Sequence, residues 1–252
     1  MSLTTVERTI LEKYARDAGW EIAAETSEGS VKLFSSFFGE TARIQKDGQD
    51  LFSLSLSRRL DPARLDSSVR LASGGEFVFS HDEVYKIRAV LRRAAELFAS
   101  LPDTPLENYR KKLSEFSDAG IQHTESERLV KERVGQDIYR DALVNYWGGS
   151  CAGTGCMLKD ALRASHAKPW KDCESDAERL NVYNGFLLTA NLDALFDKGY
   201  ISFTDEGLIM ISSHLEPSDL SPLGLSPHLS LRWLEEGHKP FLAYHREHVW
   251  KN

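Results

Sequence analysis

The spacing of hydrophobic residues in the first hundred positions changes from that of a helix to that of a strand, and then back to that of a helix. Between residues 4 and 18 they recur every three or four positions, which predicts an amphipathic helix that ends at Gly19. Three hydrophobic residues between positions 52 and 56 alternate with serines, which is typical of a half-buried strand. Asp47 and Gly48 favour a turn just ahead of it. The N-terminal part is therefore expected to combine helices with antiparallel strands.

A second amphipathic helix is predicted over residues 81–100. Ser80 and Glu83 have the spacing of a capping box, in which two side chains satisfy the first amides of a helix. A cationic helix face is usually solvated, but it can also follow a phosphate backbone, and the sequence leaves both interpretations open. The cations on this face are Lys86, Arg88, Arg92 and Arg93.

Prolines follow this second helix. Pro105 lacks an amide donor and disfavours helical backbone in the residue before it, so the helix is expected to stop nearby. We interpret residues 103–125 as a linker. It would join an N-terminal α+β domain, residues 1–102, to a C-terminal domain, residues 126–252, whose first 21 residues show helical periodicity.

Composition limits the class of protein. Hydrophobic residues make up 41% and charged residues 27%, and no stretch approaches the roughly 18 apolar residues of a membrane span. The first residues do not have the pattern of a secretory signal, so a cytoplasmic protein is expected. Three cysteines argue against a disulfide framework. The net charge of -7 is not that of a basic nucleic-acid binder, but acidic and basic residues are equal in number between Arg128 and Tyr200.

The pattern between Cys151 and Tyr200 predicts a strand, a loop, a second strand and a helix. One apolar stretch ends at His166, just ahead of a proline, and the next begins at Asn184. Thr189 stands where the N-cap of the following helix belongs.

Four residues of this segment have the chemistry that phosphodiester hydrolysis requires. Neutral imidazole takes up a proton near pH 7, so His166 is the candidate general base. Asp193 and Asp197 are four positions apart on the predicted helix and project from one face, where carboxylate oxygens suit Mg or Mn. Asn184 has a donor and an acceptor that can hold the loop before it by bonds to backbone on both sides. Each residue alone is more often structural or solvated, so the interpretation rests on their order.

This order resembles the HNH endonuclease family, whose ββα-metal fold has the same succession of strand, strand and helix. The most similar branch has the motifs Cys-x-x-Thr-Gly, Ala-x-His-x-x-Pro-Trp, an Asn-Gly-Leu-Leu-Leu-like strand and Leu-Phe-Asp-x-Gly. The resemblance extends upstream to residues 133–140 and downstream to residues 201–203 and 245–246, roughly half of the chain. The matching residues are Cys151, Thr154 and Gly155; Ala164, His166, Pro169 and Trp170; Asn184 to Leu188; and Leu195, Phe196, Asp197 and Gly199.

The resemblance implies a role for each candidate. His166 would be the general base, Asn184 the residue that holds the loop, and Asp193 the metal ligand in place of the family's second histidine. Ser165 occupies a position where many relatives have another ligand, so water, phosphate or Asp197 would complete the metal shell. We expect Mg or Mn. Structural zinc is not expected, because the paired Cys-x-x-Cys motifs of some relatives are absent.

The sequence therefore predicts an α+β protein. Its C-terminal ββα-metal (HNH) nuclease domain, with a core at residues 151–204 and helical flanks, would cleave DNA in a restriction-like defence role. The small N-terminal α+β domain would recognise or position the DNA, which we expect to be double-stranded. No membrane partner is expected, and a homodimer is compatible with the sequence. Two alternatives stay open: a catalytically silent DNA-binding or regulatory protein with the HNH fold, and a small-molecule hydrolase that uses Asp193 and Asp197.

Overall fold

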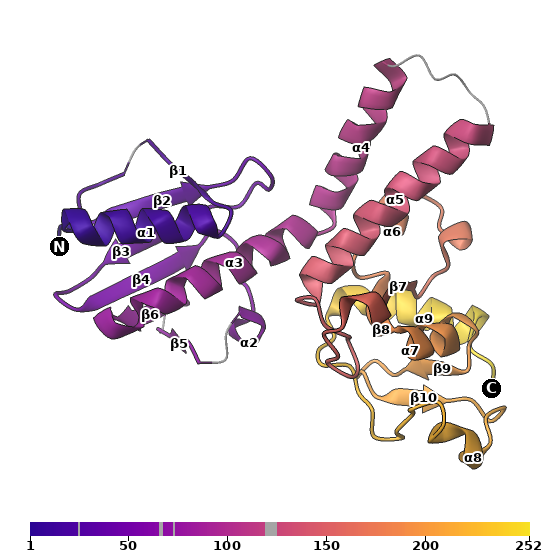
Figure 1. Cartoon of the computed structure of the whole chain (residues 1–252). Coiled ribbons are helices and arrows are strands. Elements are labelled where there is room, and N and C mark those ends of the chain that lie inside the picture. Colours follow the sequence, from indigo (N-terminus) through magenta and orange to yellow (C-terminus); the bar gives the residue numbers. More distant parts are fainter. Residues whose placement is uncertain (25, 66–67, 73, 119–124) are drawn as a thin grey trace. The chain divides into compact units, whose positions relative to one another are not determined.

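The chain separates into two compact units, Met1–Ala99 and Ser100–Asn252 (Figure 1). They are called unit 1 and unit 2 below. Among the described residues, none of the helices combines the length and the apolar character that a membrane crossing requires. The computed structural model describes the whole chain except residues 25, 66–67, 73 and 119–124.

Unit 1 is built around a six-stranded antiparallel sheet with the order β1-β2-β3-β4-β6-β5. The helices and strand predicted from its hydrophobic pattern are confirmed, as is the turn after β3. Its elements are α1 (Thr5–Asp17), β1 (Glu21–Ile22), β2 (Ser30–Phe34), β3 (Ala42–Lys46), β4 (Leu51–Leu56), α2 (Pro62–Leu65), β5 (Arg70–Leu71), β6 (Phe77–Ser80), the 3-10 turn η1 (His81–Glu83) and α3 (Val84–Ser100).

The two faces of this sheet differ. Leu33 and Ile44, on adjacent strands, are completely buried, and helices α1 and α3 lie over their face of the sheet (Figure 1). The indole of Trp20 donates a hydrogen bond of 2.9 Å to the carbonyl of Leu91 in α3 and helps to fix that helix. Lys32 and Arg43 alternate with the buried residues and are exposed on the opposite face. The helices therefore cover one side of the sheet and leave the other side open.

Helix α3 ends at Ser100, as the prolines after it predicted, and helix α4 (Asp103–Asp118) then occupies most of the range interpreted as a linker. Pro105 is only the third residue of α4. An amide in the first turn has no partner within the helix, so a proline is tolerated at this point. The Tyr109 hydroxyl donates a hydrogen bond of 3.3 Å to the carbonyl of Lys131 in the next helix, which ties α4 into unit 2. Residues 119–124 lie outside the described residues.

Unit 2 combines helices with two antiparallel hairpins, β7 with β8 and β9 with β10. The predicted succession of strand, loop, strand and helix is confirmed by β7, β8 and α7, and α7 packs on both strands. Its elements after α4 are α5 (Glu125–Tyr146), η2 (Lys159–Ala161), β7 (Leu162–His166), η3 (Trp170–Asp172), α6 (Asp176–Arg179), β8 (Gly185–Thr189), α7 (Ala190–Asp197), β9 (Ile201–Phe203), β10 (Ile209–Ile211), α8 (Pro217–Leu220), η4 (Glu236–His238) and α9 (Lys239–His248).

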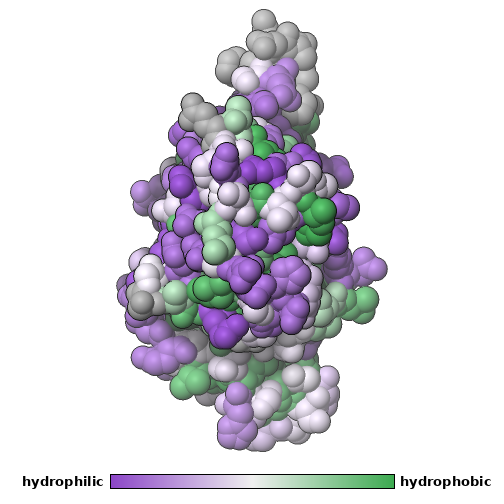
Figure 2. Space-filling model, turned by 90° about the vertical axis from the view of Figure 1, so that its left-hand side faces the viewer, coloured by the Kyte–Doolittle hydropathy of each residue, from purple (hydrophilic) through white to green (hydrophobic). Residues whose placement is uncertain are grey.

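Much of unit 2 is irregular backbone held by side chains. The guanidinium of Arg232 donates hydrogen bonds of 2.9 to 3.0 Å to the carbonyls of Trp147, Ser150 and Cys151. Its charged group also lies 4.5 Å from the ring centre of Trp233. Bonds of this kind satisfy backbone groups that no helix or sheet pairs. Figure 2 shows the molecule from the left-hand side of Figure 1, where unit 1 is drawn, and hydrophilic residues cover most of that face, with hydrophobic ones scattered among them.

Candidate active site

One pocket of unit 2 brings two of the predicted site residues together. It has a volume of about 350 Å³, and its walls come from α5, β7, Trp170 and α7. His166 at the end of β7 and Asp193 in α7 both line it, whereas Asn184 and Asp197 do not. The candidate base and the candidate metal ligand therefore face the same small volume.

The ring of His166 is oriented by backbone and by aromatic neighbours. Its Nε2 lies 2.9 Å from the carbonyl oxygen of Arg179. A carbonyl oxygen only accepts hydrogen bonds, so Nε2 carries the proton and Nδ1 has the lone pair. The Tyr139 ring stacks on the imidazole at 3.8 Å between centres, and Trp170 meets it edge-on at 5.5 Å. No hydrogen bond to Nδ1 is found among the described residues.

Burial lowers the pKa of His166 from 6.5 to about 4, and the carbonyl of Arg179 opposes that shift only in part. Charged imidazolium loses its hydration when it is packed between rings, which is why burial favours the neutral form. At neutral pH the ring is therefore uncharged and able to accept a proton.

Tyr139 and two glycines fix the floor of this site. The buried Tyr139 hydroxyl donates a hydrogen bond of 2.9 Å to the carbonyl of Asn184. A side chain at Gly185 would collide with that hydroxyl and with the backbone of Ser165, so the hairpin requires glycine. A side chain at Gly135 would likewise collide with the Trp170 ring. These contacts hold α5 against the β7–β8 hairpin.

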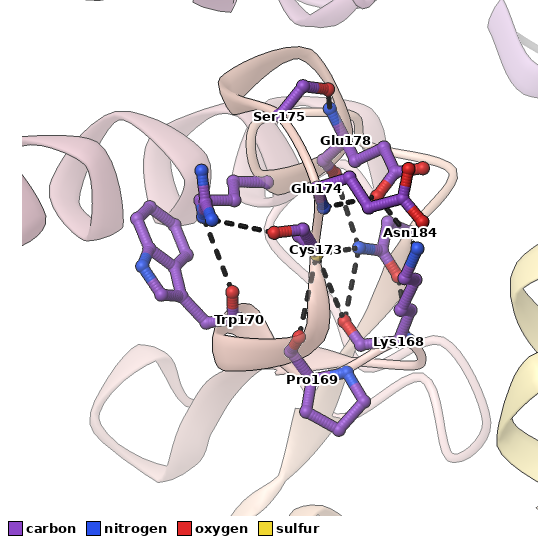
Figure 3. A network of polar contacts seen from close by, with 9 residues as sticks. Lys168, Pro169, Trp170, Cys173, Glu174, Ser175, Glu178 and Asn184 are labelled. Carbon is purple, nitrogen blue, oxygen red and sulfur yellow. Dashed lines mark hydrogen bonds and ion pairs between the residues drawn. The ribbon is translucent and has the colours of Figure 1, made fainter. Parts of the chain in front are cut away.

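Asn184 holds the loop after His166 from inside (Figure 3). Its side chain is completely buried. Oδ1 accepts a hydrogen bond of 2.8 Å from the Lys168 amide, and Nδ2 donates bonds of 3.2 Å to the carbonyls of Lys168 and Glu178. Asn184 thus bonds to backbone on both sides of the loop, as its amide chemistry leads one to expect. Glu178 precedes Arg179, so the same side chain also positions the carbonyl that orients His166.

A ring of polar contacts surrounds Asn184 in Figure 3. The ammonium of Lys168 pairs with the Glu178 carboxylate at 2.9 Å, and that carboxylate also accepts a hydrogen bond from the Glu174 amide. The Arg179 guanidinium donates to the carbonyls of Trp170 and Cys173. The loop between β7 and β8 is therefore fixed by many bonds, which reduces the movement of the histidine at its start.

Asp193 is a half-buried carboxylate at the pocket wall. Burial raises its pKa and the neighbouring Asp197 raises it further, while Arg163 and Lys198 act in the opposite direction. The largest cause is the loss of water around the carboxylate, which disfavours its charged form. A cation bound in the pocket would favour the charged form again.

Asp197 occupies a different environment. It is exposed, and its carboxylate lies 2.8 Å from the ammonium of Lys198. Across the part of the chain that the structure describes, no three His, Cys, Asp or Glu residues are grouped so as to hold a metal. Mg²⁺ usually needs only one or two carboxylates, because water and substrate phosphate complete its shell. Asp193 therefore fits a hard cation that is bound together with the substrate, rather than one held by protein alone.

Two arginines also line the pocket, and the sequence did not single them out. Arg140 in α5 donates a hydrogen bond of 3.0 Å to the Leu162 carbonyl. Arg163 in β7 donates to the same carbonyl and to that of Asp160. Neither is in a salt bridge within the described ranges. Tyr139 and Arg140 lie at the end of the upstream segment, residues 133–140, to which the resemblance extends. That position was the one signal in the sequence that could have pointed to them. Nothing in the pattern showed that α5 forms a wall of the pocket.

The segment that contains β7, β8 and α7 matches a family of known proteins. The family model described as HNH endonuclease matches residues 151–204. Among curated proteins, none matches the chain. The matched range contains His166, Asn184 and Asp193 together with β7, β8 and α7. The resemblance to the HNH endonuclease family is thereby confirmed for residues 151–204.

Proposed function

We propose that the protein is a metal-dependent endonuclease that hydrolyses phosphodiester bonds in DNA. The observation that carries the proposal is that a neutral His166, tied to backbone through Nε2, lines the same pocket as Asp193. A proton acceptor and a hard anionic ligand in one pocket are the two groups that such hydrolysis needs from a protein.

His166 is the general base in this proposal. Nδ1 takes a proton from the attacking water, and the ring becomes imidazolium. The Arg179 carbonyl then accepts a stronger hydrogen bond from Nε2, and the negative phosphate offsets the new charge. The stacked Tyr139 ring keeps the imidazole from turning away. Asn184 acts through the loop rather than on the substrate, because it is buried and outside the pocket.

The phosphate would be bound by Arg140 and Arg163, whose guanidinium groups match the geometry of phosphate oxygens. Asp193 would hold the divalent ion, Mg²⁺ or Mn²⁺, and Asp197 would join it only after leaving Lys198. A bound ion supplies positive charge to the phosphate and the leaving oxygen. Duplex DNA as substrate, a restriction-like role and DNA positioning by unit 1 are further parts of this proposal.

A catalytically silent DNA-binding protein is the second candidate. Ser165 in place of a further ligand and the small number of acidic groups in the pocket favour it. Incubation of the purified protein with supercoiled plasmid, with Mg²⁺ or Mn²⁺ and with a chelator control, separates the two. Nicked or linear product that requires the metal and disappears in Asp193→Ala is expected. DNA binding without cleavage under every metal would favour the silent protein.

A further inference from the structure

The open face of the sheet in unit 1 is a surface that the proposed nuclease chemistry does not use. It lies opposite the face covered by α1 and α3, on strands β2, β3 and β4. We call it the open sheet face and define it by five side chains that point away from the helices: Lys32, Phe34, Arg43, Gln45 and Ser55.

Two cations stand directly opposite each other at its centre. Lys32 of β2 pairs in register with Arg43 of β3, and Ser55 of β4 is next in the same row. Like charges in directly opposed positions destabilise a sheet. Both side chains are exposed, and neither forms an ion pair or side-chain hydrogen bond within the described part of unit 1. An anion bound between them would remove the repulsion.

An aromatic side chain lies beside this pair. Phe34, two positions after Lys32 on the same strand face, is 41% exposed, and Phe37 in the loop that follows is 73% exposed. The acidic residue opposite Phe34 is Glu21, whose carboxylate already accepts hydrogen bonds of 2.7 and 2.8 Å from the amide and hydroxyl of Ser36. Among the described residues, this face therefore offers unpaired positive charge next to the accessible ring of Phe34.

The cationic face of α3 is the competing surface in unit 1. Its charges are largely paired within the protein. Arg88 lies 3.8 Å from Asp17, Arg93 lies 3.0 Å from Glu96, and Lys86 pairs with Glu83. Ion pairs of this kind must be broken or shared before the cations can bind phosphate. On the open sheet face, Lys32 and Arg43 have no such ion pair with any residue that the structure describes.

We propose that the open sheet face binds single-stranded DNA, with Lys32 and Arg43 on successive phosphates and Phe34 stacked on an unpaired base. Cationic surfaces with exposed aromatic rings bind single strands because every base has a face on which a ring can stack. In a duplex the base faces are already covered by stacking, so Phe34 would have no partner there. This site is independent of the proposed nuclease chemistry and takes a different form of DNA.

The test is binding of a fluorescent oligothymidylate of about 15 nucleotides, the upper end of known site sizes, to the full-length protein in chelator. Fluorescence anisotropy reports affinity whether or not the protein cleaves DNA. In the Lys32→Ala/Arg43→Ala double variant, the slope of log affinity against log salt should become shallower by about 0.7 for each lost contact. Phe34→Ala should weaken binding at least about fivefold, and Phe34→Trp should keep it.

Arg88→Ala/Arg92→Ala on α3 is the matched control, since it removes two cations from the same unit. It should leave the affinity within about twofold, a change too small to represent a lost phosphate contact. A duplex of the same length should bind more weakly and show no effect of Phe34→Ala. Absence of binding, an unchanged salt slope in the sheet variant, equal loss in the α3 variant, or duplex binding that depends equally on Phe34 would each overturn the proposal. Thermal melting of every variant excludes misfolding as the cause.

Discussion

Two histidines of unit 2 have nearly the same surroundings, but only one of them has a ring nitrogen free to act as a base among the described residues. His166 and His245 each stack on an aromatic ring at 3.8 Å, and each has Nε2 at 2.9 Å from a backbone carbonyl. Burial lowers the pKa of both to about 4. Neither the residue type nor the direction of the pKa shift distinguishes them.

The difference lies at the second nitrogen. Nδ1 of His245 is 3.0 Å from the Ser202 hydroxyl, and the ring is completely buried, so both nitrogens are used inside the protein. His166 lines the pocket that contains Asp193, and its Nδ1 has no partner among the described residues. A histidine can serve as a base only when one nitrogen is held and the other is accessible. His245 is therefore a structural residue, whereas His166 is the candidate base.

The largest expected effect is the loss of cleavage activity when His166, but not His245, is replaced. His166→Ala should lower divalent-dependent plasmid cleavage by about 100-fold or more, the usual contribution of a general base. Its melting temperature should fall by less than that of His245→Ala, because the lost ring leaves one backbone carbonyl without its donor, whereas His245→Ala leaves two buried polar groups without partners. Gel analysis of cleavage and thermal melting measure the two properties. Undiminished cleavage by this variant would remove His166 from the mechanism.

His245→Ala should instead lower the free energy of unfolding by about 3 kcal/mol, because it leaves a cavity and two buried polar groups without partners. Those groups are the Ser202 hydroxyl and the Phe196 carbonyl. Denaturant titration followed by tryptophan fluorescence measures the loss. The variant should retain cleavage at temperatures where it is folded. A stable protein without activity would mean that the two histidines have been assigned the wrong way round.

The free energy of unfolding should also depend on pH, and both histidines should contribute to this dependence in the same direction. Their folded pKa of about 4 lies below the ordinary value of 6.5, so between these values the unfolded chain binds more protons than the folded one. Stability is then fully present above pH 6.5 and falls as the pH decreases toward 4, by at most about 1.4 kcal/mol per pH unit for each group. Replacing either histidine by Gln should make this dependence shallower. An unchanged slope in both variants would contradict the buried neutral state.

The smallest effect is expected from the exposed aspartate of the pair on α7. Asp197→Ala should change cleavage by less than about threefold, because its carboxylate is exposed, lies outside the pocket and is paired with Lys198 at a surface where ion pairs contribute little. Asp193→Ala, one turn away on the same helix, is the matched comparison and should lose most activity. Equal losses in the two variants would indicate that both carboxylates bind the metal.

The sequence predicted the order of the strands and the helix in unit 2 better than it predicted which residues contact one another in the fold. Periodicity and the spacing of His166, Asn184 and Asp193 were enough for β7, β8 and α7, since these elements are adjacent in the chain. The carbonyl of Arg179 carries no side-chain signal, so its bond to His166 was unpredictable. The stacking of Tyr139 depends on α5 packing against the hairpin, which is a long-range contact.

The prolines predicted the end of α3 at Ser100 but not the new helix α4 that follows it. Pro105 is compatible with α4 because a proline in the first turn of a helix costs little. In unit 1, the alternation of the strands predicted which face of the sheet would be buried but not which helices would cover it. That choice depends on the packing of Trp20 and the helices over the sheet, which no short pattern reports.

The most direct measurement is the tautomer of His166, read from ¹⁵N–¹H correlations of the histidine rings at neutral pH, with His166→Gln used for assignment. The expected result is an uncharged ring with its proton on Nε2 and a bare Nδ1 toward the pocket. A proton on Nδ1, or a charged ring at neutral pH, would contradict it.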